Sequence, residues 1–227
     1  IERAITASGA GDTIRLVPGV YNGPVNFNGI EIVLESMAYE AGDLELISET
    51  FFAPGPIGGS CLVLDGGSNN NLTIRGISFR GGSDTYGGGL IITNCSPSLE
   101  DVIVEDNSAE IGGGIYISGS DATLINTTVR NNGANYGGGI FVLDGTPLFE
   151  SVLIEDNIAY WGGGFYIENS ESTIRYSKMK NNDSFIEGAG LYQYGGVCEI
   201  EWTAFENNNG YDYGGAIVAD QATLDLD

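Results

Sequence analysis

The chain contains no histidine, and its 227 residues include only eight lysines and arginines against 31 aspartates and glutamates. The missing histidine removes the usual sets of zinc ligands. The formal net charge of −23 repels nucleic acid and anionic membrane surfaces, so we exclude both as partners. Such a surface attracts multivalent cations or basic proteins, or it simply keeps the protein soluble.

Long apolar runs and a secretory signal are also missing, so the sequence predicts no membrane-spanning helix. The chain opens at Ile1 without an initiator methionine, as a mature or trimmed piece does. Cysteine is scarce, and Cys61, Cys95 and Cys198 have no metal-ligand spacing. In the repeat described below, the last two occupy different columns several coils apart, so we expect no intrachain disulfide.

Glycine is abundant, with 36 residues in a recurring pattern. Triplets recur at a constant interval, beginning at Gly87, Gly112, Gly137 and Gly162, and weaker copies follow at a slightly longer interval from Gly188 and Gly214. Each unit holds short alternating apolar runs and no stretch with helical spacing. Because a short repeat of strands and turns stacks its copies in parallel, the sequence predicts an all-β parallel β-helix, a solenoid with coils of about 25 residues.

The predicted core consists of three columns that hold one apolar residue per coil. They read Ile74, Leu99, Leu124, Phe149, Ile174 and Ile200; Phe79, Val104, Val129, Ile154, Met179 and Phe205; and Leu90, Ile115, Ile140, Phe165, Leu191 and Ile217. Between the second and third lies an asparagine column, Asn107, Asn132, Asn157, Asn182 and Asn208. Asparagine tolerates the left-handed conformation of a tight turn, and stacked copies bond to one another as a ladder. The glycine triplet likewise indicates a close-packed bend, with no helix behind it to form a phosphate site.

We expect one domain over residues 1–227, with an N-terminal cap at 1–10, irregular first coils at 11–73 and regular coils at 74–227. The segment from Ile1 to Ala7 is amphipathic as a helix and would hide the open edge of the first coil. The last residues restart the repeat, with Leu224 continuing the Leu124 column, so we expect the native protein to continue beyond Asp227. Proline and glycine at 48–60 break the coil frame, which makes this loop the expected place of any non-repetitive function.

One outward column alternates in charge at every coil and reads Arg80, Glu105, Arg130, Glu155, Lys180 and Glu206. Each charge then lies between two opposite ones, which disfavours a slipped register. The next column carries acids only on alternate coils, as Asp106, Asn131, Asp156 and Asn181. Three of the eight bases are thus committed to structure rather than to chemistry.

A second outward column predicts an exposed aromatic strip, flanked by glycines, that could act as a binding site: Tyr116, Phe141, Tyr166 and Tyr192, with Ile91 and Val218 at its ends. Aromatic strips stack on sugar faces or anchor protein interfaces. The alternatives are ring stacking for stability alone, or cover by another part of a longer chain.

Four acids are candidates for calcium, since they follow the third core strand in loops that stack along one edge: Asp121, Asp144, Glu168 and Glu171. Calcium takes about six to eight oxygen ligands. Solvated acids are the default on so acidic a surface, so we assign no metal and no cofactor and keep calcium as the alternative.

Two stretches resemble known families. "FENN" at 205–208 followed by "GGAI" at 214–217, with looser copies such as "VEDN…GGGI", resembles the repeats of polymorphic outer-membrane protein passengers, which are surface adhesins built as right-handed β-helices. "AGDTIRLVPGVYNGPVNF" resembles the first coil of pectin-lyase-like proteins, which include pectinesterases, pectate lyases and non-catalytic surface proteins. The resemblance implies a right-handed β-helix and leaves the function open.

The catalytic elements of the enzymatic relatives are missing: Gly-His-Gly, Gln-Asp-Thr-Leu and Arg-x-Pro-x-x-Arg do not occur. The sequence therefore predicts a non-catalytic module, secreted or on a bacterial outer surface, that acts as an adhesin or stalk and presents a rigid face to a surface protein or glycan. The first alternative is a polysaccharide lyase or other carbohydrate-active enzyme, with Arg175 or Lys178 as the base beside Tyr176 or Tyr192. The second is a rod that assembles with copies of itself.

Overall fold

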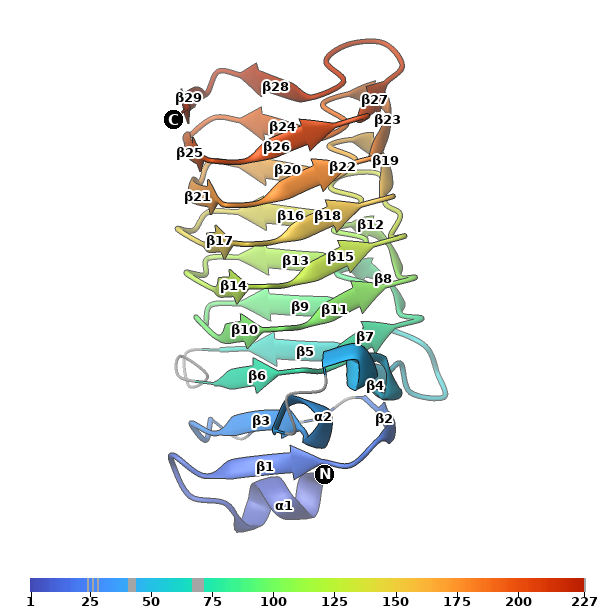
Figure 1. Ribbon diagram of the computed structural model, residues 1–227, viewed down its shortest axis with the longest axis vertical. Helices are drawn as coiled ribbons and strands as arrows, with labels where there is room; N and C mark the ends of the chain where they lie inside the picture. The colour runs from blue at the N-terminus through green and yellow to red at the C-terminus, as the bar shows by residue number, and fades with distance from the viewer. Residues whose placement is uncertain (24, 26, 28, 41–43, 67–71, 227) are drawn as a thin grey trace.

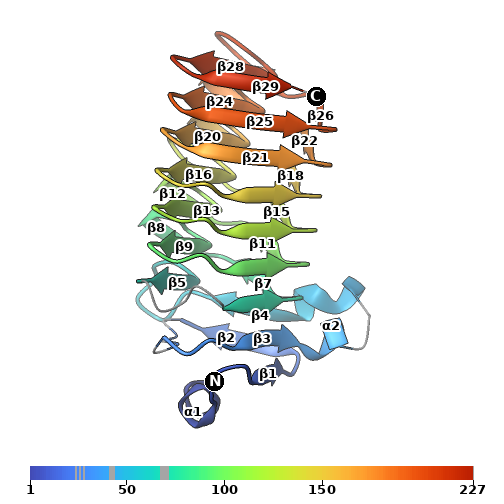
Figure 2. The ribbon, with the colours of Figure 1, turned by 90° about the vertical axis from the view of Figure 1, so that its left-hand side faces the viewer.

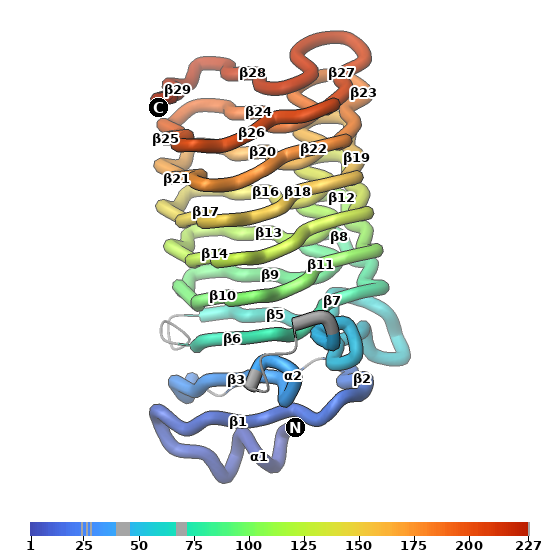
Figure 3. The backbone as a smooth tube through the Cα atoms, in the orientation of Figure 1, coloured from blue at the N-terminus to red at the C-terminus, as the bar shows by residue number. Residues whose placement is uncertain are grey.

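The structure, a computed structural model, describes residues 1–227 except 24, 26, 28, 41–43, 67–71 and 227. The backbone winds into a rod of stacked coils with the chain ends near opposite ends of the stack (Figure 1, and as a tube in Figure 3). No helix in the described part of the chain is long and apolar enough to cross a membrane.

Strands of successive coils pair in parallel and form three long sheets. The first sheet contains, in order, β1 (Thr13–Leu16), β3 (Val33–Ser36), β6 (Thr73–Arg75), β10 (Ser98–Glu100), β14 (Thr123–Ile125), β17 (Leu148–Glu150), β21 (Glu171–Arg175), β25 (Val197–Glu201) and β29 (Thr223–Leu226). The second contains β2 (Gly19–Asn22), β4 (Thr50–Ala53), β7 (Ser78–Arg80), β11 (Ile103–Glu105), β15 (Thr128–Arg130), β18 (Leu153–Glu155), β22 (Lys178–Lys180) and β26 (Ala204–Glu206). The third contains β5 (Leu62–Asp65), β9 (Leu90–Thr93), β13 (Ile115–Ser118), β16 (Ile140–Leu143), β20 (Phe165–Glu168), β24 (Leu191–Tyr194) and β28 (Ile217–Asp220).

A fourth, discontinuous sheet lies between the second and third in each regular coil. It contains β8 (Ser83–Tyr86), β12 (Ser108–Ile111), β19 (Ile158–Trp161), β23 (Asp183–Glu187) and β27 (Asn209–Gly210). Isolated bridges through Gly133 and Tyr136 join its two groups of strands. Among the described residues, seven coils carry a strand in each of the first three sheets, with incomplete coils at both ends.

A short helix, α1 (Glu2–Ala7), lies under β1 at the N-terminal end of the rod (Figure 1), and its Ile5 is fully buried against the core. The predicted helical cap is therefore confirmed. The irregular first coils also hold α2 (Met37–Glu40), which stands out from the side of the rod in Figure 2, and a 3-10 helix, η1 (Leu44–Glu49).

The expectation for the loop at 48–60 is wrong in part, because residues 50–53 form β4 and continue the second sheet between β2 and β7. Phe52 is fully buried and stacks on Phe79 with ring centroids 5.5 Å apart. The apolar side chain therefore holds this strand in the coil frame despite the nearby Pro and Gly, and only the stretch after Ala53 departs from it.

Strand register confirms the three apolar columns. Leu99, for example, pairs with both Ile74 and Leu124, and all three are fully buried. One detail is wrong: Leu224 pairs with Cys198, while Leu226 pairs with Ile200 and so continues the core column. The last coils are slightly longer than the regular ones, which moves the register forward.

The asparagine column forms the predicted ladder of buried side chains. Asn132 donates from its backbone N–H and from Nδ2 to Asn157 Oδ1, at 2.9 and 3.0 Å, and its Nδ2 also donates to the Val104 carbonyl. The left-handed residue is not the ladder asparagine but the residue before it, with φ of 55° at Asn131 and 56° at Asp156. This assignment follows from the geometry, since the ladder amide must point inward while its neighbour turns the chain.

The glycine triplet is structural, as expected. The first glycine, Gly162, has φ of +64°, and a Cβ added to the third, Gly164, would lie 2.6 Å from the Gly190 carbonyl oxygen of the next coil. A side chain at either place would strain the bend.

The predicted charge ladder exists, and a second one accompanies it. Glu105 bonds Arg130 at 2.6 Å and lies 3.9 Å from Arg80, and Lys180 bonds Glu155 at 2.8 Å. On the first sheet, Arg15, Glu35, Arg75, Glu100, Ile125, Glu150, Arg175 and Glu201 form a further outward column. Within the described part of the chain, seven of the eight basic residues form ion pairs with these and neighbouring acids.

Candidate binding face

The predicted aromatic strip is assembled on the third sheet. Tyr116, Phe141, Tyr166 and Tyr192 occupy equivalent positions in β13, β16, β20 and β24. Their successive ring centroids are 5.7, 5.0 and 5.0 Å apart, and the rings are nearly parallel. The expected exposure is wrong for two members, because Phe141 and Tyr192 are only 5% and 8% exposed.

Neighbouring rings account for this burial. Each ring of the strip faces the next one, while Tyr86 packs tilted against Tyr116 and Tyr136 packs edge-on against Tyr166 at 5.6 Å. Burial raises the pKa of the Tyr166 and Tyr192 hydroxyls. The contacts of the strip are therefore chiefly those of cross-strand stacking.

A different aromatic column is exposed on the fourth sheet. It consists of Tyr160, Phe185 and Tyr211, which are 48%, 47% and 65% exposed. The centroids of Tyr160 and Phe185 are 5.4 Å apart, and those of Phe185 and Tyr211 are 5.9 Å apart. We call these three residues the outer aromatic column.

The sequence contains a signal for this column, because each ring stands three residues after a ladder asparagine, namely Asn157, Asn182 and Asn208. Each ring comes shortly before a glycine bend, in "YWGGG", "FIEGAG" and "YDYGG". The structure shows a register shift between β19 and β23, where Ala159 pairs with Ser184 but Trp161 pairs with Glu187. This bulge inserts an extra residue and so makes the coil longer than the regular ones.

A groove of about 390 Å³ lies at the foot of the outer aromatic column. It is lined by Asn135, Tyr136, Tyr160, Trp161 and Ile186. Tyr136 and Trp161 stack with centroids 4.9 Å apart and an angle of 5° between the rings. The backbone N–H of Tyr160 donates to the Asn135 carbonyl of the preceding coil. Asn135, which is exposed, therefore occupies the position just before the first ring of the column.

The two alternative bases lie on different sheets, although Arg175 is the chain neighbour of Tyr176 and interacts with it electrostatically. Arg175 lies on the first sheet and bonds Glu150 at 2.6 Å, whereas Lys178 lies on the second sheet and bonds Glu206 at 2.7 Å. The hydrogen bond to Glu150 raises the pKa of Arg175, which is the wrong direction for a general base. Tyr192 lies on the third sheet and is buried, and Tyr176 occupies an exposed turn with φ of 52°.

The acids considered for calcium are not all in loops, and one of them is already hydrogen-bonded within the protein. Asp121 accepts hydrogen bonds from the backbone N–H and hydroxyl of Thr146, and Glu168 and Glu171 belong to strands β20 and β21 rather than to loops. Within the described residues, no group of three or more Asp, Glu or Cys side chains is placed to hold a metal ion.

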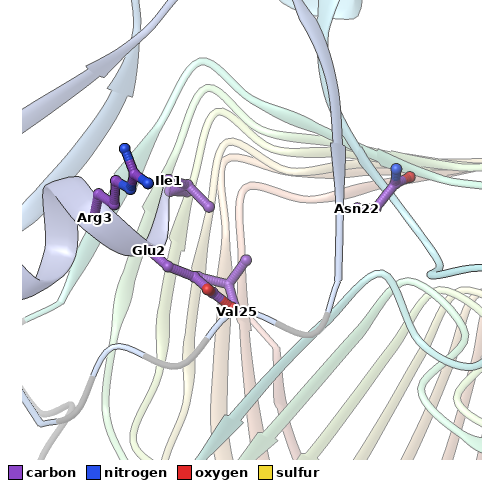
Figure 4. Close-up of a pocket in the computed structure, with 5 residues that line it drawn as sticks. All are labelled: Ile1, Glu2, Arg3, Asn22 and Val25. Carbon is purple, nitrogen blue, oxygen red and sulfur yellow. The ribbon is translucent and has the colours of Figure 1, made fainter.

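Two further hollows lie near the N-terminal end. One of about 370 Å³ is lined by Ile1, Glu2 and Arg3 from the start of the chain, with Asn22 and Val25 facing them (Figure 4). The other, of about 420 Å³, lies under the loop around Ile57, which is fully exposed. Neither hollow contains an aromatic ring or a charge cluster, so the fourth sheet is the better candidate.

Sheet topology and the repeated turns define a parallel β-solenoid. A family model described as "Right handed beta helix region" matches residues 60–226, and the chain belongs to this family. No curated protein matches the sequence. A solved structure described as ORF18 of Geobacillus virus E2 is similar over 94% of this chain and 56% of its own, with 11% identity and a TM-score of 0.45. The chain thus spans little more than half of that protein, and so distant a likeness carries no argument about function.

Proposed function

We propose that the protein is a non-catalytic binding module, secreted or displayed on a bacterial outer surface, that acts as an adhesin-like element. The outer aromatic column would be the part that contacts a surface protein or glycan. The observation that carries this proposal is the column of half-exposed rings on a parallel sheet, in which Phe185 stacks on Tyr211 and packs tilted against Tyr160. Rings held in this way bury a large area at little cost in side-chain entropy.

Two features favour binding over catalysis. Seven of the eight basic residues are engaged in ion pairs, among them both candidates for a lyase base. The fold itself is compatible with a structural or binding module and with a carbohydrate-active domain, so the side chains must decide between these classes. The exposed rings are the strongest ligand-binding feature among those side chains.

The proposal is tested on printed arrays of bacterial and host glycans and of surface proteins. The chain should retain at least one ligand, and the variant with Tyr160→Ser, Phe185→Ser and Tyr211→Ser should lose it. A matched control is Tyr176→Asn with Trp202→Asn, because these rings are also exposed but lie in turns between the first and second sheets. Equal retention by the aromatic variant and the native chain would contradict the proposal.

A parallel assay addresses the lyase alternative. Incubation with polygalacturonate should release no unsaturated uronate, measured by its ultraviolet absorbance. Release that disappears in Arg175→Gln or Lys178→Gln would instead establish an enzyme.

A further inference from the structure

Basic residues are segregated around the rod. Arg3 belongs to α1, and the other seven lie on the first sheet (Arg15, Arg75 and Arg175) or on the second (Arg80, Arg130, Lys178 and Lys180). The described strands of the third and fourth sheets contain no lysine or arginine. The ladders therefore offset most of the acidic charge on the strands of the first two sheets, and no base offsets it on the described strands of the other two.

Acids remain on the side that has no bases. The fourth sheet and its flanking turns carry Asp84, Glu110, Asp183, Glu187 and Asp212. On the third sheet, Asp220 and Glu187 add to burial in raising the pKa of Tyr192. A negative potential without counter-charges favours a positively charged partner.

The outer aromatic column adjoins these acids, because its outward position is occupied by polar residues in the coils that precede it. The backbone N–H of Asn135 donates to the Glu110 carbonyl, and the N–H of Tyr160 donates to the Asn135 carbonyl. The same outward position is thus occupied by an exposed carboxylate, an exposed amide and then an aromatic ring, with the groove beside the last two. Trp161 in that groove pairs with Glu187 of the next coil, so a second carboxylate lies close by.

Ring faces and carboxylates attract the same kind of ligand. Aromatic faces carry negative quadrupole charge and bind cations, and guanidinium is the cation that stacks on rings while it donates hydrogen bonds to carboxylates and amides. An anionic ligand would be repelled, and a neutral sugar could donate hydrogen bonds to the acids but would gain no charge attraction from them. The chemistry therefore favours arginine.

We infer that the outer aromatic column and its groove bind an extended, arginine-rich segment of a basic partner protein, an inference that rests on the proposed function and names its ligand. The ring spacings of 5.4 and 5.9 Å set the register. An extended peptide advances about 6.6 Å per two residues, so arginines at alternate positions meet successive rings. The bulge at Phe185 and Ile186 bends this strand and re-aims its side chains.

The experiment uses calorimetric titration of the whole chain with a synthetic peptide of alternating arginine and serine. Comparison ligands are the same peptide with lysine, the same peptide with glutamate, and a neutral β-linked oligosaccharide. The test variant is Tyr160→Ser with Tyr211→Ser, and the control is Tyr176→Asn with Trp202→Asn. Circular dichroism checks the fold, and the single variants Tyr160→Ser and Phe185→Ser replace the pair if it unfolds.

The native chain should bind the arginine peptide more tightly than the lysine peptide and should ignore the glutamate peptide. Loss of two rings should weaken arginine binding about tenfold, and the control should leave it unchanged. Added salt should weaken both cationic peptides but preserve the preference for arginine.

Equal affinity of the native chain and the ring variant for the arginine peptide would overturn the inference, because charge alone would then explain the binding. So would the absence of binding by the native chain. If the neutral oligosaccharide binds, and only through the rings, the inference fails while the proposed function stands. Equal retention on the arrays by the native chain and the aromatic variant is a separate failure, that of the proposed function.

Discussion

The amide of Asn157 satisfies four partners inside the rod. Its Oδ1 accepts from the backbone N–H and the Nδ2 of Asn132, and its Nδ2 donates to the Val129 carbonyl and to Asn182 Oδ1. Each ladder asparagine thus joins the coil before it to the coil after it. An aspartate lacks the two donors, so it cannot replace the amide.

Asn157→Ala should destabilise the protein strongly, since it leaves buried donors and acceptors without partners. Each such group costs about 1–3 kcal/mol, so we expect a loss of roughly 3 kcal/mol or more in the free energy of unfolding. Urea titration followed by circular dichroism measures it. Asn135→Ala is the control, because this exposed asparagine lies in a neighbouring coil, and a similar loss there would argue against the ladder.

The three buried thiols should resist modification. Burial raises the pKa of Cys61 to about 12, of Cys95 to about 11 and of Cys198 to about 12, from 9.0 in the exposed state. Because the thiolate is the reactive form, a disulfide reagent at pH 8 should label none of them in the folded chain and all three in guanidinium. Rapid labelling of the folded chain would contradict the burial.

The same shifts predict how stability changes in alkali. In the unfolded chain the thiols ionise near 9.0 and in the folded chain only at 11 to 12, so above pH 9 the folded chain binds more protons. The free energy of unfolding should therefore fall as the pH rises from 9 to 11. Cys198→Ala should reduce this slope in a urea titration series.

At the scale of strands, the two charge ladders differ in their burial. The Glu105 side chain is only 8% exposed and lies between Arg130 and Arg80, whereas Glu150 is 31% exposed beside Arg175. A buried carboxylate depends more on its partner than a partly exposed one does.

Arg130→Glu should destabilise the rod, because it places three carboxylates in successive coils, Glu105, residue 130 and Glu155. Allowing for the partial exposure of the site, we expect a loss of about 1–2 kcal/mol. Arg175→Glu is the control and should have a clearly smaller effect in the same urea titration. Equal effects would show that burial does not distinguish the ladders.

The aromatic strip of the third sheet, which we call the inner strip, should contribute to stability rather than to binding. Tyr116→Ala with Tyr166→Ala removes the stacked contacts with Phe141 and Tyr192, and the tilted and edge-on contacts with two neighbouring tyrosines. We expect a loss of about 2–4 kcal/mol in urea titration, since the rings are half-buried. Affinity for the arginine peptide should stay within twofold or so of the native value, in contrast to the Tyr160 variant. A large loss of affinity would restore the strip as the binding site.

The regular period explains what the sequence could predict at this scale. Three core columns, the asparagine ladder and one charge ladder follow from positions that are one repeat apart. The second ladder escapes this frame because Arg15, Glu35 and Arg75 are unevenly spaced and Ile125 interrupts the alternation.

The aromatic residues show a different limit of the same frame. The outer aromatic column lies within the frame, three residues after Asn157, Asn182 and Asn208, but the same position holds Glu110 and Asn135 in the two coils before it, so no aromatic pattern runs through the whole repeat. The burial of Phe141 depends on how closely the rings of the two adjacent coils stack on it, which spacing along the chain does not give. Position could therefore be predicted for the inner strip, but exposure could not.

At the scale of the whole molecule, the rod has two chemically different sides. The first and second sheets carry ion-paired ladders, and the third and fourth carry aromatic rings among uncompensated acids. Composition predicts the excess of acids but not the confinement of the bases to one side of the rod. That segregation becomes visible only when each coil is divided into its four strands, and it is the basis of the proposed binding side.

Photo-cross-linking tests the binding side most directly. An alternating arginine and serine peptide that carries a photoreactive group is irradiated with the whole chain, and mass spectrometry locates the cross-linked residues. The account predicts that they fall in Ile158–Trp161, Asp183–Glu187 and Asn209–Gly210 and the residues next to these strands. Cross-links spread evenly over the acids of the rod, or concentrated on the first and second sheets, would contradict it.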